Sequence, residues 1–162
     1  MDDQSDAGRA EPSRRDLAAM LAPLAQAFAT AELPILRAHN LTMWAYVVLI
    51  TLADNPIRSQ ARLAAATGAD KTRIIPILDD LQARGLIDRY PDPADRRVHL
   101  LALTDEGLRL CRAAQAQIQR HEEEVLARID PADRAGLLRA LAALSALPAE
   151  EITGDHESPP TP

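Results

Sequence analysis

The sequence is poor in cysteine, in aromatic residues and in long apolar runs, and each shortage excludes a class of protein. A single cysteine, Cys111, cannot form an intrachain disulfide, which excludes a disulfide-stabilised fold and is typical of a reducing compartment. Aromatic residues make up 2% of the chain against 47% hydrophobic residues, so the core must consist of Leu, Ala, Ile and Val. Because Ala and Leu lose little free energy on entering a helix, we expect a mainly helical fold.

No uncharged apolar run approaches the roughly 20 residues that cross a bilayer. The first six residues, Met-Asp-Asp-Gln-Ser-Asp, are acidic and lack the apolar segment of a signal peptide. At 162 residues the chain has the length of one domain with a substantial core. We therefore expect a cytoplasmic protein of one domain that makes no membrane contact.

What the chain does contain is a helix-turn-helix pattern in its middle third. A polar helix is expected from Ser59 to Thr67, followed by a turn at Gly68-Ala69. A second helix is expected from Asp70 to Arg84, with Gly85 just beyond its end.

A short β-hairpin is expected directly after this second helix. Two apolar segments, Leu86-Ile87 and Val98–Leu103, flank the charged sequence Asp-Pro-Ala-Asp-Arg-Arg at 92–97, and Ile57-Arg58 has the composition of a third short strand. A helix-turn-helix followed by an arginine-tipped hairpin is typical of a unit that reads duplex DNA. The fold class that we predict is therefore mainly α with a small β-wing.

The charge distribution is compatible with such a unit, although the formal net charge is −6. Residues 55–103 contain eight basic and six acidic side chains, a formal charge of +2, so that the remainder carries −8. A charge segregated in this way orients a protein on DNA with its acidic body away from the phosphates. We expect a modest DNA affinity that is very sensitive to salt.

Helical patterns flank the DNA-reading unit on both sides. They span residues 13–38, 41–52, 104–129 and 131–147, with a break or kink expected near Pro34, while residues 1–12 and 151–162 have the composition of disordered tails. The first and last helices each carry a leucine-rich face. These faces either complete one core or pack against the same helices of a second chain, and we favour the second interpretation because a two-fold dimer would match a palindromic site.

Several motifs together resemble the multiple-antibiotic-resistance regulator (MarR) family of winged-helix repressors. The resemblance extends from about Leu17 to Leu147 and is carried by Asn40-Leu41-Thr42, Leu63-Ala64 with Gly68, Arg84-Gly85-Leu86-Ile87, Asp95-x-Arg97, and Leu103-Thr104 with Gly107. It implies a triangular homodimer with a DNA-binding lobe at about 55–104 and dimerisation helices at about 13–38 and 108–147. Such proteins usually repress their own operon and release DNA when a small phenolic or other aromatic compound, or an oxidant, acts on them.

The wing supplies the first group of candidate DNA-binding residues. Arg97 occupies the family's wing-arginine position, where a guanidinium suits a narrow minor groove. Asp95 is expected to accept hydrogen bonds that hold the arginine's approach. Arg96 and Arg89 are expected to meet phosphates or simply to face solvent, and Ser59 is expected to meet a phosphate. The alternative interpretation is a solvated charged hairpin tip.

The start of the second helix supplies the remaining candidates. Lys71, Thr72 and Arg73 lie on its first turn, and Arg73 is suited to a bidentate pair with guanine. Ile75 is placed either to touch a thymine methyl or to pack. Ile75 and Pro76 depart from the family pattern, and an interior proline deletes one helical hydrogen bond, which puts base reading in doubt more than DNA binding.

Position within the family suggests an effector pocket formed by His39, Met43, Trp44 and Val47, with an aromatic acid or phenol as its ligand. The alternative is that Trp44 belongs to the core, because aromatic residues on apolar helices more often do.

Cysteine and histidine chemistry is weakly indicated elsewhere. Cys111 is expected to be a buried small hydrophobe. His121 and Glu124 have a spacing used in metal sites, but one pair without further ligands favours an exposed charged helix, so we expect no metal and no cofactor.

The sequence thus predicts a dimeric DNA-binding regulator, acting as a repressor that a small aromatic effector releases from a palindromic operator. The alternative is a winged-helix protein–protein interaction module with weak or no sequence-specific DNA binding, which the net acidity and Pro76 would favour. No nucleophile–base pair, phosphate loop or metal cluster is visible, so we do not expect an enzyme.

Overall fold

The computed structural model describes residues 14–54, 58–68 and 71–154. The predicted N-terminal tail and most of the predicted C-terminal tail lie outside these residues. The chain divides into two compact units at the boundary between Ile118 and Gln119, and each unit is described by itself. The fold is mainly helical with a small antiparallel sheet, as the sequence predicts.

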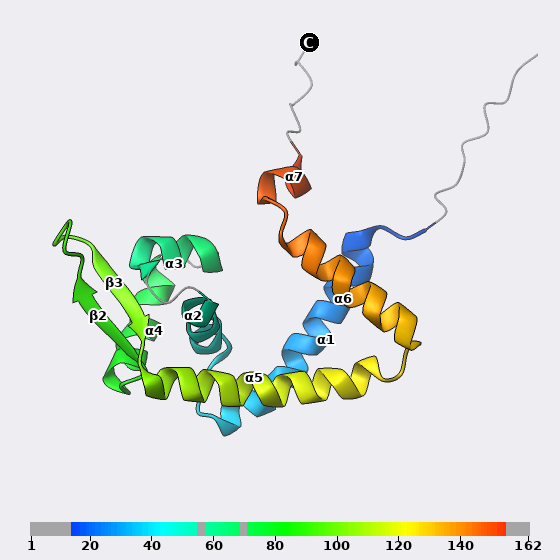
Figure 1. The fold of residues 1–162 in the computed structure, drawn as a ribbon, viewed down its shortest axis with the longest axis horizontal. Coiled ribbons are helices and arrows are strands. Elements are labelled where there is room, and N and C mark those ends of the chain that lie inside the picture. The colour runs from blue at the N-terminus through cyan, green and yellow to red at the C-terminus, as the bar shows by residue number, and fades with distance from the viewer. Residues whose placement is uncertain (1–13, 55–57, 69–70, 155–162) are drawn as a thin grey trace, which may run out of the picture. The chain divides into compact units, whose positions relative to one another are not determined.

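The N-terminal unit begins with α1, which spans Leu17–Ala38 after an N-cap at Asp16 (Figure 1). The predicted break near Pro34 is wrong, since the helix continues through both Pro23 and Pro34, while the alternative of a kink stays a prediction. The missing N–H of Pro34 frees the carbonyl of Thr30, and Thr30 is exposed, so water can satisfy that carbonyl. Among the described residues, α1 is also the one helix long and apolar enough to cross a membrane by length and composition.

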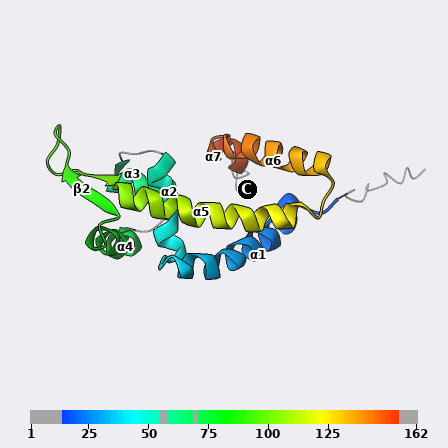
Figure 2. The same cartoon turned by 60° about the horizontal axis from the view of Figure 1, so that its bottom comes forward.

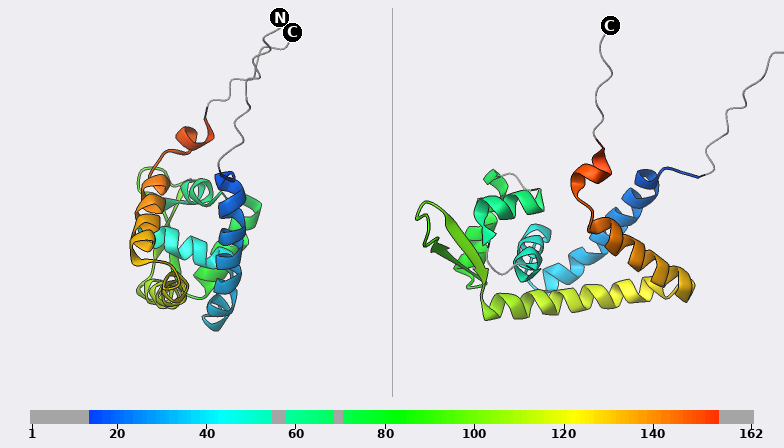
Figure 3. Two further views of the ribbon diagram at one scale, coloured as in Figure 1. Left: turned by 90° about the vertical axis from the view of Figure 1, so that its right-hand side faces the viewer. Right: turned by 45° about the horizontal axis from the view of Figure 1, so that its top comes forward.

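The second helix, α2, spans Met43–Asp54 and is the core of this unit. Its start is capped by Thr42, whose side-chain oxygen accepts a hydrogen bond of 3.1 Å from the backbone N–H of Ala45. Val48, Leu49 and Leu52 are fully buried on it. Helices α3 and α4 and strand β3 all pack against α2. Figure 3 shows the ribbon from two further directions.

The helix-turn-helix consists of α3, Gln60–Thr67, and α4, Lys71–Ala83. The side chain of Ser59 caps α3 by accepting from the backbone N–H of Arg62 at 3.3 Å, and Gly68 ends it in the left-handed conformation with φ 63°. Ala69 and Asp70 lie outside the described residues. The prediction of two helices separated by a glycine turn is therefore confirmed, and Pro76 lies inside α4 without ending it.

Gly85 ends α4 through a specific pair of backbone hydrogen bonds. Its φ of +68° allows Leu86 to donate to the carbonyl of Leu81 at 2.9 Å while Gly85 itself donates to Gln82 at 2.9 Å. This pair of bonds, with Leu81 and Leu86 both buried, is a Schellman motif. It explains why a glycine follows the recognition helix and why an apolar residue follows the glycine.

A three-stranded antiparallel sheet in the order β1-β3-β2 forms the wing (Figure 2). The strands span Arg58–Ser59, Ile87–Pro91 and His99–Leu103. The central strand, β3, pairs with both neighbours, and Leu101 at its middle is fully buried. The short third strand is confirmed at Arg58, whereas the first hairpin strand begins one residue later than predicted and runs on to Pro91.

The long helix α5, Asp105–Leu126, begins where the hairpin ends. Thr104 connects the two, since its hydroxyl donates to the carbonyl of Gly85 at 2.7 Å and accepts from the backbone N–H of Gly107 at 3.0 Å. Gly107 lies directly against the backbone of Leu86, with no room for a Cβ atom. The threonine and glycine of the Leu-Thr-x-x-Gly sequence thus form a close contact between the end of α4 and the start of α5.

The C-terminal unit contains the end of α5, then α6, Pro131–Ser145, and α7, Ala149–Thr153. Asp130 caps α6 by accepting from the backbone N–H of Ala132 at 2.8 Å, and Arg134 pairs with Glu123. The prediction of a disordered tail from residue 151 is wrong for Glu151–Thr153, which lie in α7. None of the described residues of α6 is buried, so its leucines face outward.

Candidate DNA-binding interface

The recognition helix α4 has one buried and one exposed face. Ile74, Leu78 and Leu81 recur at helical spacing and are buried against the core. On the opposite face Thr72, Arg73 and Ile75 are exposed, with Ile75 at 48% of its surface. Three of the predicted base-reading residues therefore share the outward face of the helix. Lys71 begins the helix, and its side chain lies outside what the structure describes.

The turn of the wing is held by two aspartates. Asp92 accepts a hydrogen bond of 2.8 Å from the backbone N–H of Ala94, and Asp95 accepts one of 3.0 Å from the backbone N–H of Arg97. Backbone bonds between Asp92 and Val98 and between Val98 and Asp95, both 2.8 Å, close the loop. Asp95 thus holds the main chain of Arg97, as the sequence predicts, by fixing the turn from which the side chain projects.

The guanidinium groups of Arg96 and Arg97 are exposed at this turn. Neither forms an ion pair or a side-chain hydrogen bond with another described residue. Two adjacent cations without a protein carboxylate are available to an external anion. This arrangement suits phosphate or the electronegative floor of a minor groove.

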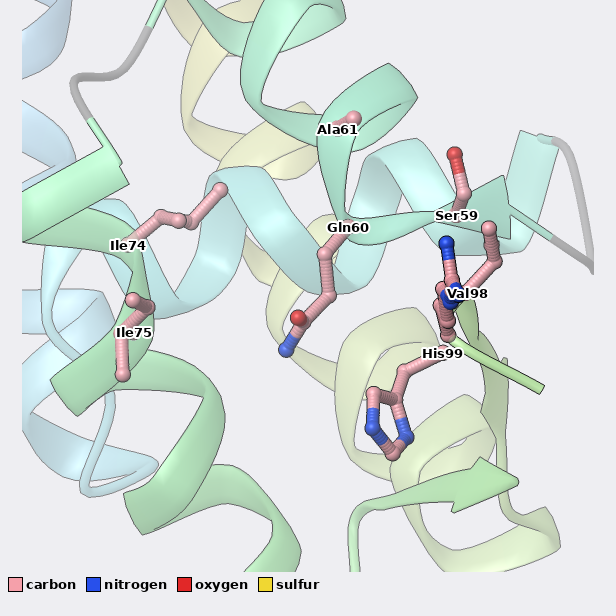
Figure 4. A pocket seen from close by; sticks show the side chains of 8 residues that line it. Ser59, Gln60, Ala61, Ile74, Ile75, Val98 and His99 are labelled. Atoms are coloured by element: carbon pink, nitrogen blue, oxygen red, sulfur yellow. The ribbon is translucent and has the colours of Figure 1, made fainter. Parts of the chain in front are cut away.

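A cavity of about 290 Å³ lies between the start of α3, the recognition helix and strand β3 (Figure 4). It is lined by residues of these three elements together with Ser59 of β1 and two residues of the turn before β3, namely Ser59, Gln60, Ala61, Ile74, Ile75, Arg97, Val98 and His99. In Figure 4 Ile74 and Ile75 lie to one side of Gln60, and Val98 and His99 lie to the other. The cavity brings together Ser59, Ile75 and Arg97, for which the sequence predicts separate DNA contacts.

Gln60 and His99 are candidate interface residues that the sequence reasoning missed. Both also line a second cavity of about 460 Å³, beside Ile75 and Arg89. Gln60 could have been found from its position in the sequence, because it follows the N-cap of α3, where backbone N–H groups point outward. His99 could be placed near this site only from the strand register, in which it lies opposite Pro91.

Arg89 has surroundings that differ from the predicted phosphate contact. Its side chain is only 16% exposed, and one guanidinium nitrogen lies 2.7 Å from a carboxylate oxygen of Asp79 on α4. Its other two nitrogens are buried and have no hydrogen-bond partner within the part of the chain that the structure describes. The side chain therefore connects strand β2 to the recognition helix, and its donors are turned away from solvent.

The four residues of the predicted effector pocket divide between two sets of contacts. Nε2 of His39 and Oε1 of Gln117 lie 3.1 Å apart, which joins the end of α1 to α5. Met43, Trp44 and Val47 are half-buried on α2, and the cation of Arg73 lies over the Trp44 ring, 5.6 Å from its centroid. None of the four lines either cavity described above.

Cys111 is fully buried on α5, as predicted. Burial, assisted by the carboxylate of Asp54 and opposed by Arg112, raises the pKa of its thiol to about 11. The described residues contain no cluster of three or more His, Cys, Asp or Glu side chains that could hold a metal ion.

Comparison with known proteins identifies the family. Residues 39–98 match the MarR family. The chain is 34% identical over 102 residues to the HTH-type transcriptional repressor NicR of Pseudomonas putida, an alignment that covers 63% of this chain and 65% of NicR. It is 34% identical over 90 residues to the transcriptional regulator HosA of Escherichia coli O111:H-, covering 56% of this chain and 67% of HosA. The chain thus spans just under two thirds of NicR.

Solved structures extend the likeness. The repressor CouR, bound to a 23-mer DNA duplex, is 30% identical with a TM-score of 0.69, and the match covers 80% of this chain and 92% of CouR. PcaV of Streptomyces coelicolor, in complex with its natural ligand, is 29% identical with a TM-score of 0.60 over 83% of this chain and 97% of PcaV. The helix-turn-helix, the wing and these relatives lead to one conclusion: the chain belongs to the MarR family of winged-helix transcriptional regulators.

Proposed function

We propose that the chain is a dimeric repressor that places α4 in the major groove of a palindromic operator and its wing in the adjacent minor groove. The observation that carries this proposal is the wing turn, where Asp92 and Asp95 hold the backbone and Arg96 and Arg97 are exposed without an ion pair to any other described residue. Beside it, α4 presents Thr72, Arg73 and Ile75 outward. CouR, solved on a DNA duplex, supports the same use of this fold. Such a regulator acts in the cytoplasm.

The dimer is supported by apolar surface at both ends of the chain. On α1, Leu17, Met20, Leu21 and Leu24 are exposed, and on α6, Leu137, Leu138, Leu141 and Leu144 are exposed. Large leucine faces of this kind mark protein contacts, because burying them removes apolar surface from water. In a two-fold dimer, two recognition helices about 34–36 Å apart would meet half-sites one turn apart on the duplex.

Release by an aromatic acid or phenol completes the proposal. PcaV has been solved with its natural ligand, which supports a ligand-responsive mechanism in this fold. The residues we assign to the effector are His39, Met43, Trp44 and Val47, on α2 and at the end of α1. Calorimetry with a small panel of hydroxybenzoates and phenylacetates tests this part, and an absence of heat from every compound would contradict it.

DNA binding is tested with Arg97→Ala on a duplex that the wild-type chain selects from a random pool. Removing one phosphate or minor-groove cation should weaken binding and lower the slope of log affinity against log salt by about one. Arg109→Ala is the matched control, because Arg109 is an exposed arginine of α5 paired with Glu106 and carries the same charge. Equal effects of the two substitutions would show that Arg97 contributes only its positive charge and makes no specific contact from the wing. Failure to select any duplex would favour the interaction module instead.

A further inference from the structure

We infer that Trp44 is a positioning residue for Arg73, and that it orients the guanidinium of the recognition helix before DNA arrives. The Cζ atom of Arg73 lies over the indole ring, 5.6 Å from its centroid. This distance is within the range of a cation–π interaction, in which the positive charge is attracted to the electron-rich ring face. The inference rests on the proposed function only in its last step, the effect on DNA.

The partner of Arg73 comes from a different element, and that element is anchored. Trp44 is the second residue of α2 and is half-buried there, beside the fully buried Val48 and Leu49. Arg73 is exposed on the outer face of α4, which packs against α2. A fixed aromatic ring therefore supports a long, flexible side chain from the side of the core.

The contact leaves the donors of Arg73 available. A guanidinium attracted to a ring face keeps its N–H groups at its edge, where they can meet guanine O6 and N7. The neighbouring carboxylates on α4 are occupied, since Asp79 pairs with Arg89 and Asp80 with Arg84. Among the described residues, Arg73 forms no ion pair of its own. Trp44 thus orients the group without consuming the donors that base reading needs.

The expected gain is entropic. A free arginine side chain loses rotamer freedom when it is held in a bidentate pair, and a side chain already held by Trp44 loses less. For an exposed cation–π contact this corresponds to about a two- to fivefold change in DNA affinity. A lysine at position 73 would lack the planar fork, so Arg73→Lys should not substitute for it.

The DNA experiment compares Trp44→Leu, Trp44→Phe, Arg73→Ala and the double variant Trp44→Leu/Arg73→Ala on a duplex selected by the wild-type chain. Trp44→Leu should weaken binding about two- to fivefold, and Trp44→Phe, which keeps a ring face, should restore most of that loss. In the Arg73→Ala background, Trp44→Leu should have no further effect, because Trp44 acts through Arg73. Equal losses in both backgrounds would show that Trp44 acts only through general packing and would overturn the inference.

A second measurement needs no DNA, because Trp44 is the one tryptophan of the sequence. Its emission reports on the charge above its ring, so Arg73→Ala should shift the emission wavelength of the folded protein, whereas Arg109→Ala should not. An unchanged emission in Arg73→Ala would show that the contact does not form in solution. This result would overturn the inference even if no duplex were ever selected, and failure of selection alone would count against the proposed function instead.

Titration of the wild-type chain with the selected duplex tests whether Trp44 assists DNA binding or competes with it. If Arg73 stays on the ring while it reads the base, the emission at saturation should remain distinct from that of Arg73→Ala. An emission that moves to the Arg73→Ala value would mean that Arg73 leaves Trp44 on binding. Trp44 would then compete with DNA rather than assist it, and the inference would be wrong.

Discussion

At Gly107 the chain has no space for even one carbon atom. A Cβ built there would overlap the carbonyl oxygen of Leu86, and backbone atoms cannot move aside as a side chain can. Gly107→Ala should therefore lower the free energy of unfolding by about 1–3 kcal/mol or more, since overpacking typically costs this much. Denaturant unfolding measures this change.

The control for that substitution is Gly136→Ala. Gly136 lies within α6, and a Cβ there would meet nothing within 4 Å. Alanine has the higher helix propensity, so this variant should be unchanged or more stable by about 0.5–1 kcal/mol. A destabilisation at Gly136 as large as that at Gly107 would contradict the explanation from overlap.

Cys111 should be chemically inert while the protein is folded. With its pKa raised to about 11, roughly one thiol in a thousand is ionised at pH 8, and the side chain is buried. Alkylation by iodoacetamide, followed by mass spectrometry, should be very slow at pH 7 and should rise with pH as the thiolate population grows. In urea the same residue should react readily, and peroxide should leave the DNA affinity of the folded protein unchanged. Rapid modification of the folded protein at pH 7 would refute this.

At the scale of elements, the wing and the recognition helix are joined by Arg89 and Asp79. The Arg89 side chain is 16% exposed while that of Asp79 is 60% exposed. Asp79→Ala would leave a largely buried guanidinium without its carboxylate, which should cost about 1–3 kcal/mol of unfolding free energy. It should also weaken DNA binding, since β2 and α4 would no longer be held together.

Asp80→Ala is the neighbouring control for this ion pair. It removes the same charge from the same helix, but its partner Arg84 is more exposed, at 31%. Exposed pairs contribute about 0–1 kcal/mol, so this variant should stay close to wild type in thermal and denaturant unfolding. Indistinguishable effects at Asp79 and Asp80 would argue against a special role for Arg89.

The ends of these elements could be predicted from sequence because local chemistry determines them. Ser59 caps α3 through its own side chain, and Gly68 and Gly85 adopt positive φ values that few other residues tolerate. The helix break predicted near Pro34 does not occur, because a proline in an exposed helix leaves a carbonyl that water can satisfy. Whether a helix face is exposed is a tertiary property that local sequence does not show.

The candidate interface was likewise predictable only in part. Arg97 and Asp95 lie in a short charged turn whose geometry follows from adjacent residues. The role of Arg89 was not predictable, because its partner lies ten residues away on another element. The Arg73–Trp44 contact was hidden for the same reason, since both residues were singled out but assigned to different sites.

At the scale of the whole molecule, the leucine face of α6 should determine the oligomeric state. Leu137, Leu141 and Leu144 recur at helical spacing and are all exposed. Leu137→Glu/Leu141→Glu should shift sedimentation from dimer to monomer, because a charged side chain cannot be buried in an apolar interface without a partner. DNA affinity should fall steeply with it, since a single recognition helix engages only half a site.

The matched control on α6 is Arg139→Glu, which adds negative charge to the same helix. Arg139 is exposed and lies outside the leucine positions. This variant should sediment as the wild-type protein does. A double glutamate variant that remained dimeric would place the contact between copies elsewhere.

The joint at Gly85, Leu86 and Thr104 has an evolutionary consequence. Its hydrogen bonds run largely between main-chain atoms and one hydroxyl, so it does not depend on which side chains α4 presents to solvent. If the proposed function holds, substitutions at the exposed positions Thr72, Arg73 and Ile75 should change which operator is preferred while α4 keeps its place in the fold. A change of preferred operator would then require the exchange of only a few outward residues of α4, while the joint to the rest of the protein stays unchanged.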